Sequence, residues 1–171
     1  MIPQVTKISH FEITYFNKEE LNILREEIFQ DQIYNIKLAN KKPLILDVGS
    51  YIGLSTLYFK LIYPKSKIVA FEPNPNIFPL LEENIYLNNI KDVILHNIAL
   101  GNDNKEKELY IDSSGNCAFS TSSFYKNAWN GRQKTIPIKI KVEKLSKYIK
   151  KDIDLLKLDV EGAELEILKE L

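Results

Sequence analysis

The sequence predicts an α/β fold built around a mainly parallel sheet. Three short apolar segments have the composition of buried strands, and they end in the acidic residues Asp47, Glu72 and Asp159. Stretches with helical periodicity separate these segments, and strands that alternate with helices form parallel sheets. Ligands of such sheets collect at the carboxyl ends of the strands. We therefore expect the three acidic residues to lie along one rim of the sheet.

The composition is that of one folded domain without a strong charge. The 171 residues are 44% hydrophobic, and 23 Lys plus Arg balance 23 Asp plus Glu, so the formal net charge is zero. This balance does not favour nucleic acid or an anionic membrane as a partner. The single cysteine excludes an intramolecular disulfide and a cysteine-cluster metal site. Because there is no apolar signal core and no run of roughly 20 apolar residues, we expect a cytoplasmic protein.

The start of the chain is expected to form a strand and a helix ahead of the sheet. Residues 8–16 have the composition of a strand. Asn17 and Glu20 form a capping-box pattern for a helix that extends to about Leu38. The expected domain boundaries are therefore 1–43 for an N-terminal strand/helix extension and 44–171 for the main domain.

Gly49 and Gly53 directly follow the first predicted core strand, and a predicted helix over residues 54–62 comes after them. A glycine turn of this kind lets the backbone approach a small charged ligand, with unpaired N–H groups directed at it. The spacing is not the dinucleotide fingerprint, because Tyr51 stands where the second glycine would be. It is not a phosphate-binding P-loop, because no Gly-Lys-Ser/Thr follows. A purely structural turn is the alternative to a ligand loop.

Glu72 lies about one strand-helix-strand unit after Asp47. An acid at the end of the second strand of such a unit can accept hydrogen bonds from the ribose hydroxyls of a nucleoside. The alternative is that Glu72 only caps the turn before Pro73. Together, the glycine turn and this acid favour a cofactor that contains a nucleoside.

The remaining segments continue the alternation and then change character. A helix is expected to start at Asn76, with Pro79 in its first turn, where a missing N–H costs little. After Gly101, alternating apolar and polar residues predict half-exposed strands separated by a long polar loop of the functional or mobile kind. The expected elements are a third core strand over 93–100, half-exposed strands over 107–112 and 136–142, the loop over 113–135, a short helix over 143–150, a buried strand over 155–160 and a last helix over 163–171.

Asp159 and Glu161 follow the last buried strand, and Gly162 permits a sharp turn into the next helix. Two carboxylates at these positions can simply begin a helix, where negative charge is favourable. The functional alternative is that they join the other acids at the rim of the sheet.

Four motifs resemble those of the FkbM-type S-adenosylmethionine-dependent methyltransferases, a branch of the class I Rossmann-like methyltransferases. They are, in order, DVGSYIG, FEPNP, NIAL and KLDVEGAEL, and the resemblance covers roughly residues 44–171. It implies a Rossmann-like sheet with helices on both faces and S-adenosyl-L-methionine as the cofactor. Ser50 and Tyr51 stand where Ala and Asn are frequent, and Ser146 occupies a place usually held by Asp.

The resemblance also implies a role for each part of the cofactor site. The loop after the first core strand would line the pocket for the methionine part. The adenine would lie at the end of the third core strand, although Asn97 also fits an ordinary strand-end residue. The residues so assigned are Asp47, Gly49, Ser50 and Gly53 for the methionine part, Glu72 for the ribose hydroxyls, and Asn97 and Ala99 for the adenine.

The activity implied by the resemblance is an in-line displacement that moves a methyl group to an acceptor oxygen and releases S-adenosylhomocysteine. The protein must align the acceptor and remove its proton, because a neutral hydroxyl is a poor nucleophile. Asp159 and Glu161 are the candidates for orienting or deprotonating the acceptor. A divalent ion held by the same carboxylates is the alternative, and no separate metal ligands are assigned. The expected acceptor is a small-molecule or sugar hydroxyl.

The predicted strand over residues 155–160 has an apolar sequence typical of a sheet centre, yet one short helix follows it. The sheet of the family normally continues with further strands. We therefore expect the C-terminal strands to be missing, or the exposed edge to be completed by a homo-oligomer. Two other functions stay open: a catalytically inactive binding domain that keeps the cofactor fold, and an RNA or protein methyltransferase, which the balanced charge disfavours.

Overall fold

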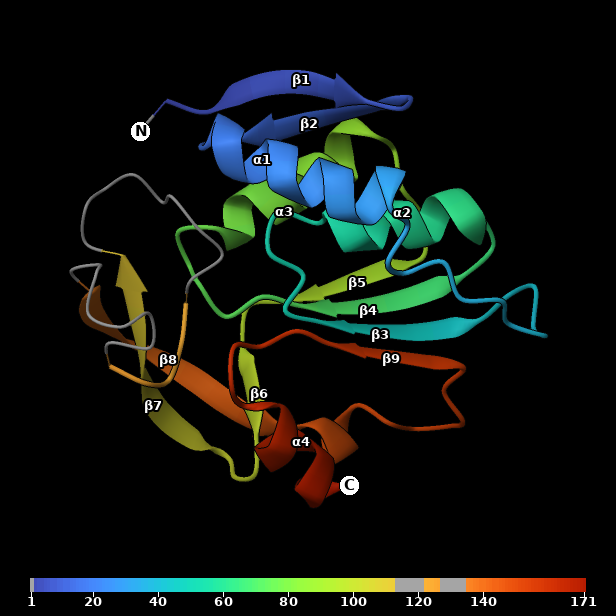
Figure 1. Cartoon of the computed structure of the whole chain (residues 1–171). Coiled ribbons are helices and arrows are strands. Elements are labelled where there is room, and N and C mark those ends of the chain that lie inside the picture. The colour runs from blue at the N-terminus through green and yellow to red at the C-terminus, as the bar shows by residue number, and fades with distance from the viewer. Residues whose placement is uncertain (1, 113–121, 127–134) are drawn as a thin grey trace.

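The computed structural model describes residues 2–112, 122–126 and 135–171. Its centre is a four-stranded sheet, shown in Figure 1, whose strands in spatial order are β5 (Val93–His96), β4 (Lys67–Phe71), β3 (Leu44–Val48) and β9 (Leu155–Leu158). All neighbouring pairs in this sheet are parallel, which confirms the predicted α/β class. The polar loop predicted over residues 113–135 lies largely outside the described residues.

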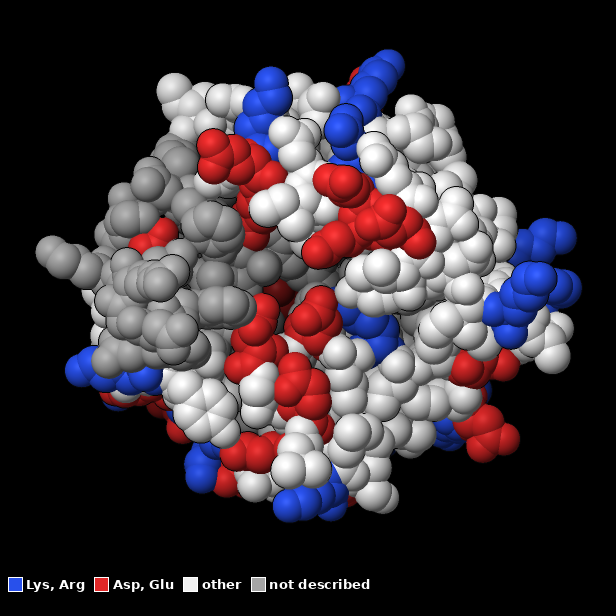
Figure 2. Space-filling model, viewed as in Figure 1, with Lys and Arg blue, Asp and Glu red and all other residues white. Residues whose placement is uncertain are grey.

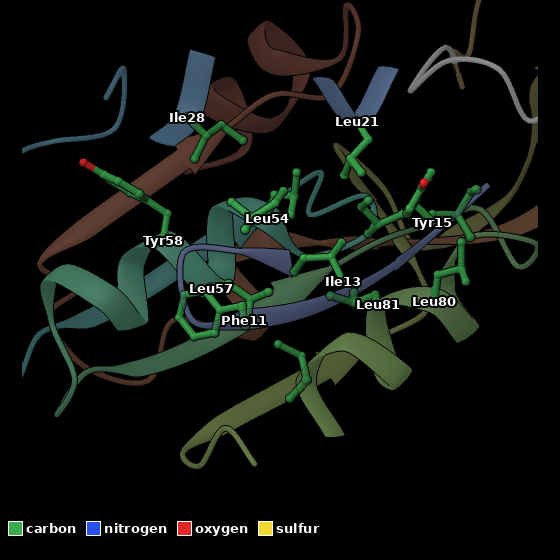
Figure 3. Close-up of a cluster of buried hydrophobic side chains, with 14 residues drawn as sticks. Phe11, Ile13, Tyr15, Leu21, Ile28, Leu54, Leu57, Tyr58, Leu80 and Leu81 are labelled. Carbon is green, nitrogen blue, oxygen red and sulfur yellow. The ribbon is translucent and has the colours of Figure 1, made fainter. Parts of the chain in front are cut away.

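One face of the parallel sheet is covered by helices, and an antiparallel hairpin packs against them (Figure 1). The helices are α1 (Lys18–Arg25), α2 (Leu54–Ile62) and α3 (Phe78–Leu87), and the hairpin consists of β1 (Gln4–Ile8) and β2 (Phe11–Tyr15). The core between them is shown in Figure 3, where Ile13, Leu57 and Leu81 are fully buried. This packing fixes α2, and with it the loop that precedes α2.

The hairpin corrects the strand that the sequence predicts over residues 8–16. This segment holds the turn and the second arm of the hairpin, because the chain reverses at Ser9, which has a left-handed φ of 56°. Both arms consist of residues with strand propensity, and the local pattern does not mark the reversal between them.

The first helix starts as predicted and ends earlier. The Asn17 side chain caps α1 by accepting a hydrogen bond from the N–H of Glu20 at 3.0 Å. Helical structure then continues through the π-helix Glu26–Gln30 and stops, so the predicted extension to Leu38 is wrong. Gln32 has a left-handed φ of 56°, which an α-helix does not accommodate.

Residues 31–43 run back along the sheet in irregular conformation. The N–H of Leu38 donates to the hydroxyl of Tyr63, at the end of α2, over 2.7 Å. The Asn40 amide donates to the Asp154 carboxylate, directly before β9, over 3.1 Å. These contacts attach the segment to the chain just before β4 and just before β9, the two strands that flank β3.

The opposite face of the parallel sheet packs against α4 (Glu164–Glu170) and a smaller second sheet (Figure 1). The strands of this sheet, in spatial order, are β6 (Ala99–Gly101), β8 (Thr135–Lys144) and β7 (Lys105–Asp112). Val48 and Phe71 of the parallel sheet are buried against Leu145 and against Ile167 of α4. Helices therefore lie on both faces, as predicted, and the second face is shared with a sheet.

Two predicted elements in this region are wrong. Residues 93–100 form two strands in different sheets, because the chain leaves the parallel sheet at Asn97. The helix predicted over residues 143–150 is reduced to a short 3₁₀ turn. The reason is that Glu143 still pairs with Leu100 of β6, so β8 occupies the first two residues of that segment.

The apolar strand β9 lies at an edge of the parallel sheet. It pairs with β3, and no second neighbour appears among the strands in the described part of the chain. The edge position therefore matches the expectation from the sequence.

None of the helices within residues 2–112, 122–126 and 135–171 has the length and hydrophobicity needed to cross a membrane.

Candidate active site

A pocket opens at the carboxyl ends of β3, β4 and β9, between the N-terminal region and the second sheet. Figure 2 shows a hollow in this face of the molecule with acidic side chains gathered beside it. The lining consists of Leu24, Ile28, Tyr34, Val48, Gly49, Ser50, Tyr51, Leu54, Ser55, Phe71, Glu72, Pro73, Ile98, Ala99, Leu100, Leu109, Ser122, Phe124, Lys157, Asp159, Val160 and Glu161. Six of the predicted site residues are in this set.

The glycine turn between β3 and α2 is shaped by close backbone contacts. Gly49 and Gly53 have left-handed φ values of 79° and 91°. At Gly49 the chain passes so near the end of β9 that an added Cβ would lie 1.9 Å from the backbone oxygen of Asp159. Only glycine satisfies both the backbone conformation and this contact.

The expected unpaired N–H groups are not found at the first three positions of the turn. The N–H groups of Gly49 and Ser50 both donate to the backbone oxygen of Phe71 at 3.0 Å. The N–H of Tyr51 donates to the Glu72 carboxylate at 2.9 Å. The N–H groups at these three positions are therefore used within the protein. In this the turn differs from loops that bind phosphate through free N–H groups.

Asp47 lies behind the turn and outside the pocket lining. Its Oδ2 accepts hydrogen bonds from Ser55 Oγ at 2.7 Å and Thr56 Oγ1 at 2.6 Å, on the first turn of α2. Its Oδ1 lies 3.3 Å from the Nζ of Lys157. The fully buried carboxylate thus joins β3, the start of α2 and β9.

Gly53 and Asn97 also lie next to the pocket and not in its lining. A Cβ at Gly53 would lie 2.7 Å from Leu81 Cδ1, so this glycine lets α3 pack closely against the turn. The Asn97 amide donates to the backbone oxygen of Glu72 at 2.8 Å and so holds the end of β4. By contrast, Ala99 lines the pocket.

Glu72 is a buried carboxyl group in the pocket wall. Oε1 accepts a hydrogen bond from the N–H of Asn74 at 2.8 Å, and Oε2 accepts one from Tyr51. Burial raises the pKa of Glu72 to about 7, because desolvation outweighs the two N–H donors and the nearby Lys157, which act in the opposite direction. The carboxyl group can therefore change its ionisation near neutral pH.

Asp159 and Glu161 lie together at the mouth of the pocket. The Asp159 side chain is 58% exposed, and its Oδ2 accepts a hydrogen bond from the Tyr34 hydroxyl at 3.2 Å. Glu161 has a left-handed φ of 54°, which a glutamate rarely adopts. Burial, followed by the charges of Asp159 and Glu164, raises the pKa of Glu161.

Metal-ligating side chains do not form a complete set in the part of the chain that the structure describes. No three His, Cys, Asp or Glu side chains come close enough there to hold a metal ion.

Sequence reasoning missed several polar residues of the lining, and two of them, Lys157 and Tyr34, contact the predicted site residue Asp159. Lys157 is the basic side chain in the lining, and a lysine inside the apolar run LLKLD was the available signal. Tyr34 comes from the segment predicted as helix, and its ring lies 5.8 Å from the Lys157 ammonium and 5.7 Å from the Phe59 ring. No local pattern indicates that Tyr34 reaches the sheet.

Comparisons with known proteins agree with this architecture. A family model described as the methyltransferase FkbM domain matches residues 47–171. Methyltransferase 1 of Beauveria bassiana is 32% identical over 171 residues, which cover 90% of this chain and 68% of that protein. Methyltransferase sdnD of Sordaria araneosa is 30% identical, over 98% of this chain and 75% of that protein.

Two further similarities are more limited in extent. The 31-O-demethyl-FK506 methyltransferase FkbM of Streptomyces tacrolimicus is 34% identical over 74 residues, which cover 42% of this chain and 28% of that protein. The crystal structure of methyltransferase FkbM from Methylobacillus flagellatus superposes with a TM-score of 0.56 at 15% identity, over 81% of this chain and 31% of that chain, and this similarity shows the fold. With the family model matching most of the sequence, this chain belongs to the FkbM family of S-adenosylmethionine-dependent methyltransferases.

Proposed function

We propose that this chain transfers the methyl group of S-adenosyl-L-methionine to a hydroxyl group of a small molecule. The family supplies the cofactor and the reaction class. The choice of site rests on one observation: the glycine turn, Glu72 and the carboxylates of Asp159 and Glu161 line the same cavity.

The residues around this cavity suit the cofactor. Each Glu72 oxygen accepts one backbone N–H and has a second lone pair, so the carboxylate can also accept hydrogen bonds from ribose hydroxyls. When bound, the cofactor supplies a methyl group activated by its sulfonium centre. We assign Gly49 and Ser50 to the methionine part, Glu72 to the ribose and Ala99 to the adenine, with Asp47, Gly53 and Asn97 supporting them from behind.

The two carboxylates at the mouth would serve the acceptor. Tyr34 and Lys157 hold Asp159, which would orient the acceptor hydroxyl by accepting a hydrogen bond from it. The raised pKa makes Glu161 a stronger proton acceptor than an exposed glutamate, so the hydroxyl proton would pass to Glu161. We assign no metal to this step.

The oxygen acceptor is supported by one relative. The 31-O-demethyl-FK506 methyltransferase of Streptomyces tacrolimicus is named for an oxygen position of its substrate. The acidic character of the pocket mouth also disfavours RNA, whose phosphates would meet the carboxylates of Asp159 and Glu161. A small, uncharged or cationic hydroxyl compound fits these charges better.

Neutralising the two carboxylates is expected to separate transfer from cofactor binding. In D159N and E161Q, S-adenosylhomocysteine should bind within about threefold of the unchanged protein, because neither side chain is assigned to the cofactor. Methyl transfer should fall by roughly 10²-fold or more when a positioned acid–base group is lost. Calorimetry measures the first quantity, and transfer of labelled methyl groups from S-adenosylmethionine to a panel of sugars and other hydroxyl compounds measures the second.

Three outcomes decide between the functions. Labelled product that disappears in both variants supports the proposal. Binding of S-adenosylhomocysteine without product from any small acceptor, but with label entering RNA or protein, would contradict it in favour of a macromolecular substrate. Binding without labelled product of any kind would identify a cofactor-fold binding domain.

The edge of β9 leads to a further expectation about assembly. An apolar edge strand pairs readily with another chain, so we propose that two copies associate through β9. Sedimentation velocity should show a dimer at micromolar concentration. A monomer over the whole range from about 1 to 100 µM would contradict association at this edge.

A further inference from the structure

Lys157 occupies an unusual place for a lysine, at the junction of the glycine turn and β9. Its side chain is 7% exposed. The ammonium group donates to the backbone oxygen of Gly49 at 2.5 Å and lies 3.4 Å from that of Val48. The same group lies 3.3 Å from Asp47 Oδ1 and 3.8 Å from Asp159 Oδ2.

These contacts join the two halves of the proposed site. Asp47 and Lys157 are paired neighbours on β3 and β9, so their side chains extend from the same sheet face. From there the ammonium reaches forward to the turn carbonyls on one side and to Asp159 on the other. A single cation therefore contacts the cofactor side and the acceptor side.

The polar groups around the ammonium depend on it. Asp47 Oδ1 is buried and has no hydrogen-bond donor among the described residues, so its stabilising contact is the ion pair with Lys157. An aliphatic side chain at position 157 would leave this oxygen and the Gly49 carbonyl without their cation, and buried groups in that state move toward other donors or water.

We propose that Lys157 is a positioning residue that fixes the glycine turn in the conformation that receives the cofactor. It holds the Gly49 carbonyl and thereby the backbone that lines the pocket, and it places Asp159 at a set distance from that backbone. The inference rests on the proposed function, since the turn is assigned there to the methionine part of the cofactor. Lys157 would act on the cofactor through the backbone of the turn and would not touch the methyl group.

Two simpler roles make different predictions. If Lys157 only neutralises buried Asp47, removing both charges together should restore normal binding. If it acts only by its charge, its loss should favour S-adenosylmethionine over S-adenosylhomocysteine, because the sulfonium carries one more positive charge. A positioning role predicts that both ligands weaken by a similar factor and that the turn itself becomes less protected.

The test is a double-mutant cycle of K157M and D47N, with both ligands titrated by calorimetry. Methionine is unbranched and apolar, so it occupies the space of the aliphatic part of the lysine side chain without its charge. We expect K157M to weaken both ligands by about tenfold or more, and by a similar factor in the D47N background, because a charged hydrogen bond to the turn is lost in each case.

Hydrogen exchange gives a readout that needs no ligand. In K157M the amides of Gly49, Ser50 and Tyr51, which are all hydrogen-bonded, should exchange about tenfold faster or more, while the amide of Leu57 within α2 keeps its rate. Unchanged exchange of the turn, no further effect of K157M beside D47N, or tighter S-adenosylmethionine binding would each overturn the inference. If the unchanged protein bound neither ligand, the proposed function would fail instead, and hydrogen exchange would still decide whether Lys157 holds the turn.

Discussion

Replacing Gly49 with alanine is expected to destabilise the protein by about 3 kcal/mol or more and to abolish binding of S-adenosylhomocysteine. The new Cβ would lie 1.9 Å from the backbone oxygen of Asp159, so either the turn or the end of β9 must move. Backbone atoms cannot rotate away as a side chain can. The left-handed φ of 79° adds strain for any residue with a Cβ.

G162A is the matched control for this prediction. Gly162 also has a left-handed φ, of 103°, but an added Cβ would lie 3.1 Å from a side-chain atom of Tyr125 and would meet no backbone at short distance. The difference in unfolding free energy between the two variants therefore isolates the backbone contact. Equal destabilisation in urea unfolding would show that the contact between the turn and β9 is unimportant.

Changing Glu72 to glutamine is expected to weaken S-adenosylhomocysteine binding by roughly tenfold to a hundredfold at pH 8, because a charged acceptor is replaced by a neutral amide. In the unchanged protein the pKa of Glu72 is raised to about 7. Ribose hydroxyls donate to the ionised form, so affinity should increase about tenfold between pH 6 and pH 8. In E72Q this increase should vanish.

The same group gives a stability prediction with a definite sign. The folded-state pKa of Glu72 lies above its unfolded value of 4.5, so its contribution to stability is complete below pH 4.5 and is lost as the pH rises to about 7. Measured against E72Q, the unchanged protein should therefore lose unfolding free energy across that window. E83Q, which changes an exposed glutamate on α3, serves as the control, and a pH profile of E72Q identical to that of E83Q would disprove the role of Glu72.

The positions of Asp47, Glu72 and Asp159 could be predicted because each follows a short apolar run typical of a buried strand. The direction of each side chain could not. Asp47 shares a sheet face with Ile45, and on that face Ser55 and Thr56 of α2 engage its carboxylate. These hydrogen bonds depend on how α2 packs against the sheet. The sequence alone therefore does not reveal whether Asp47 lines the pocket or supports it from behind.

The missed features depend on contacts between distant parts of the chain. Residues 93–100 form a nearly continuous apolar run, and the change of sheet at Asn97 is stabilised by a hydrogen bond to Glu72. Tyr34 lies in the segment after the first helix, where the apolar periodicity of that helix continues. The path of this segment is instead set by its hydrogen bonds to Tyr63 and Asp154. Local patterns reflect neighbours along the chain, and these partners are not neighbours.

The pocket wall formed by Leu24, Ile28 and Tyr34 comes from outside the region matched by the family model, residues 47–171. One side of the cavity that we assign to the cofactor and the acceptor is therefore built by residues outside the matched region. Exchange of the first 43 residues between related enzymes would remodel this side of the cavity and, through the hydrogen bond from Tyr34, the setting of Asp159, while the sequence of the glycine turn stays the same. We therefore expect that acceptor preference can change through this stretch while Gly49, Glu72 and Glu161 keep their identity.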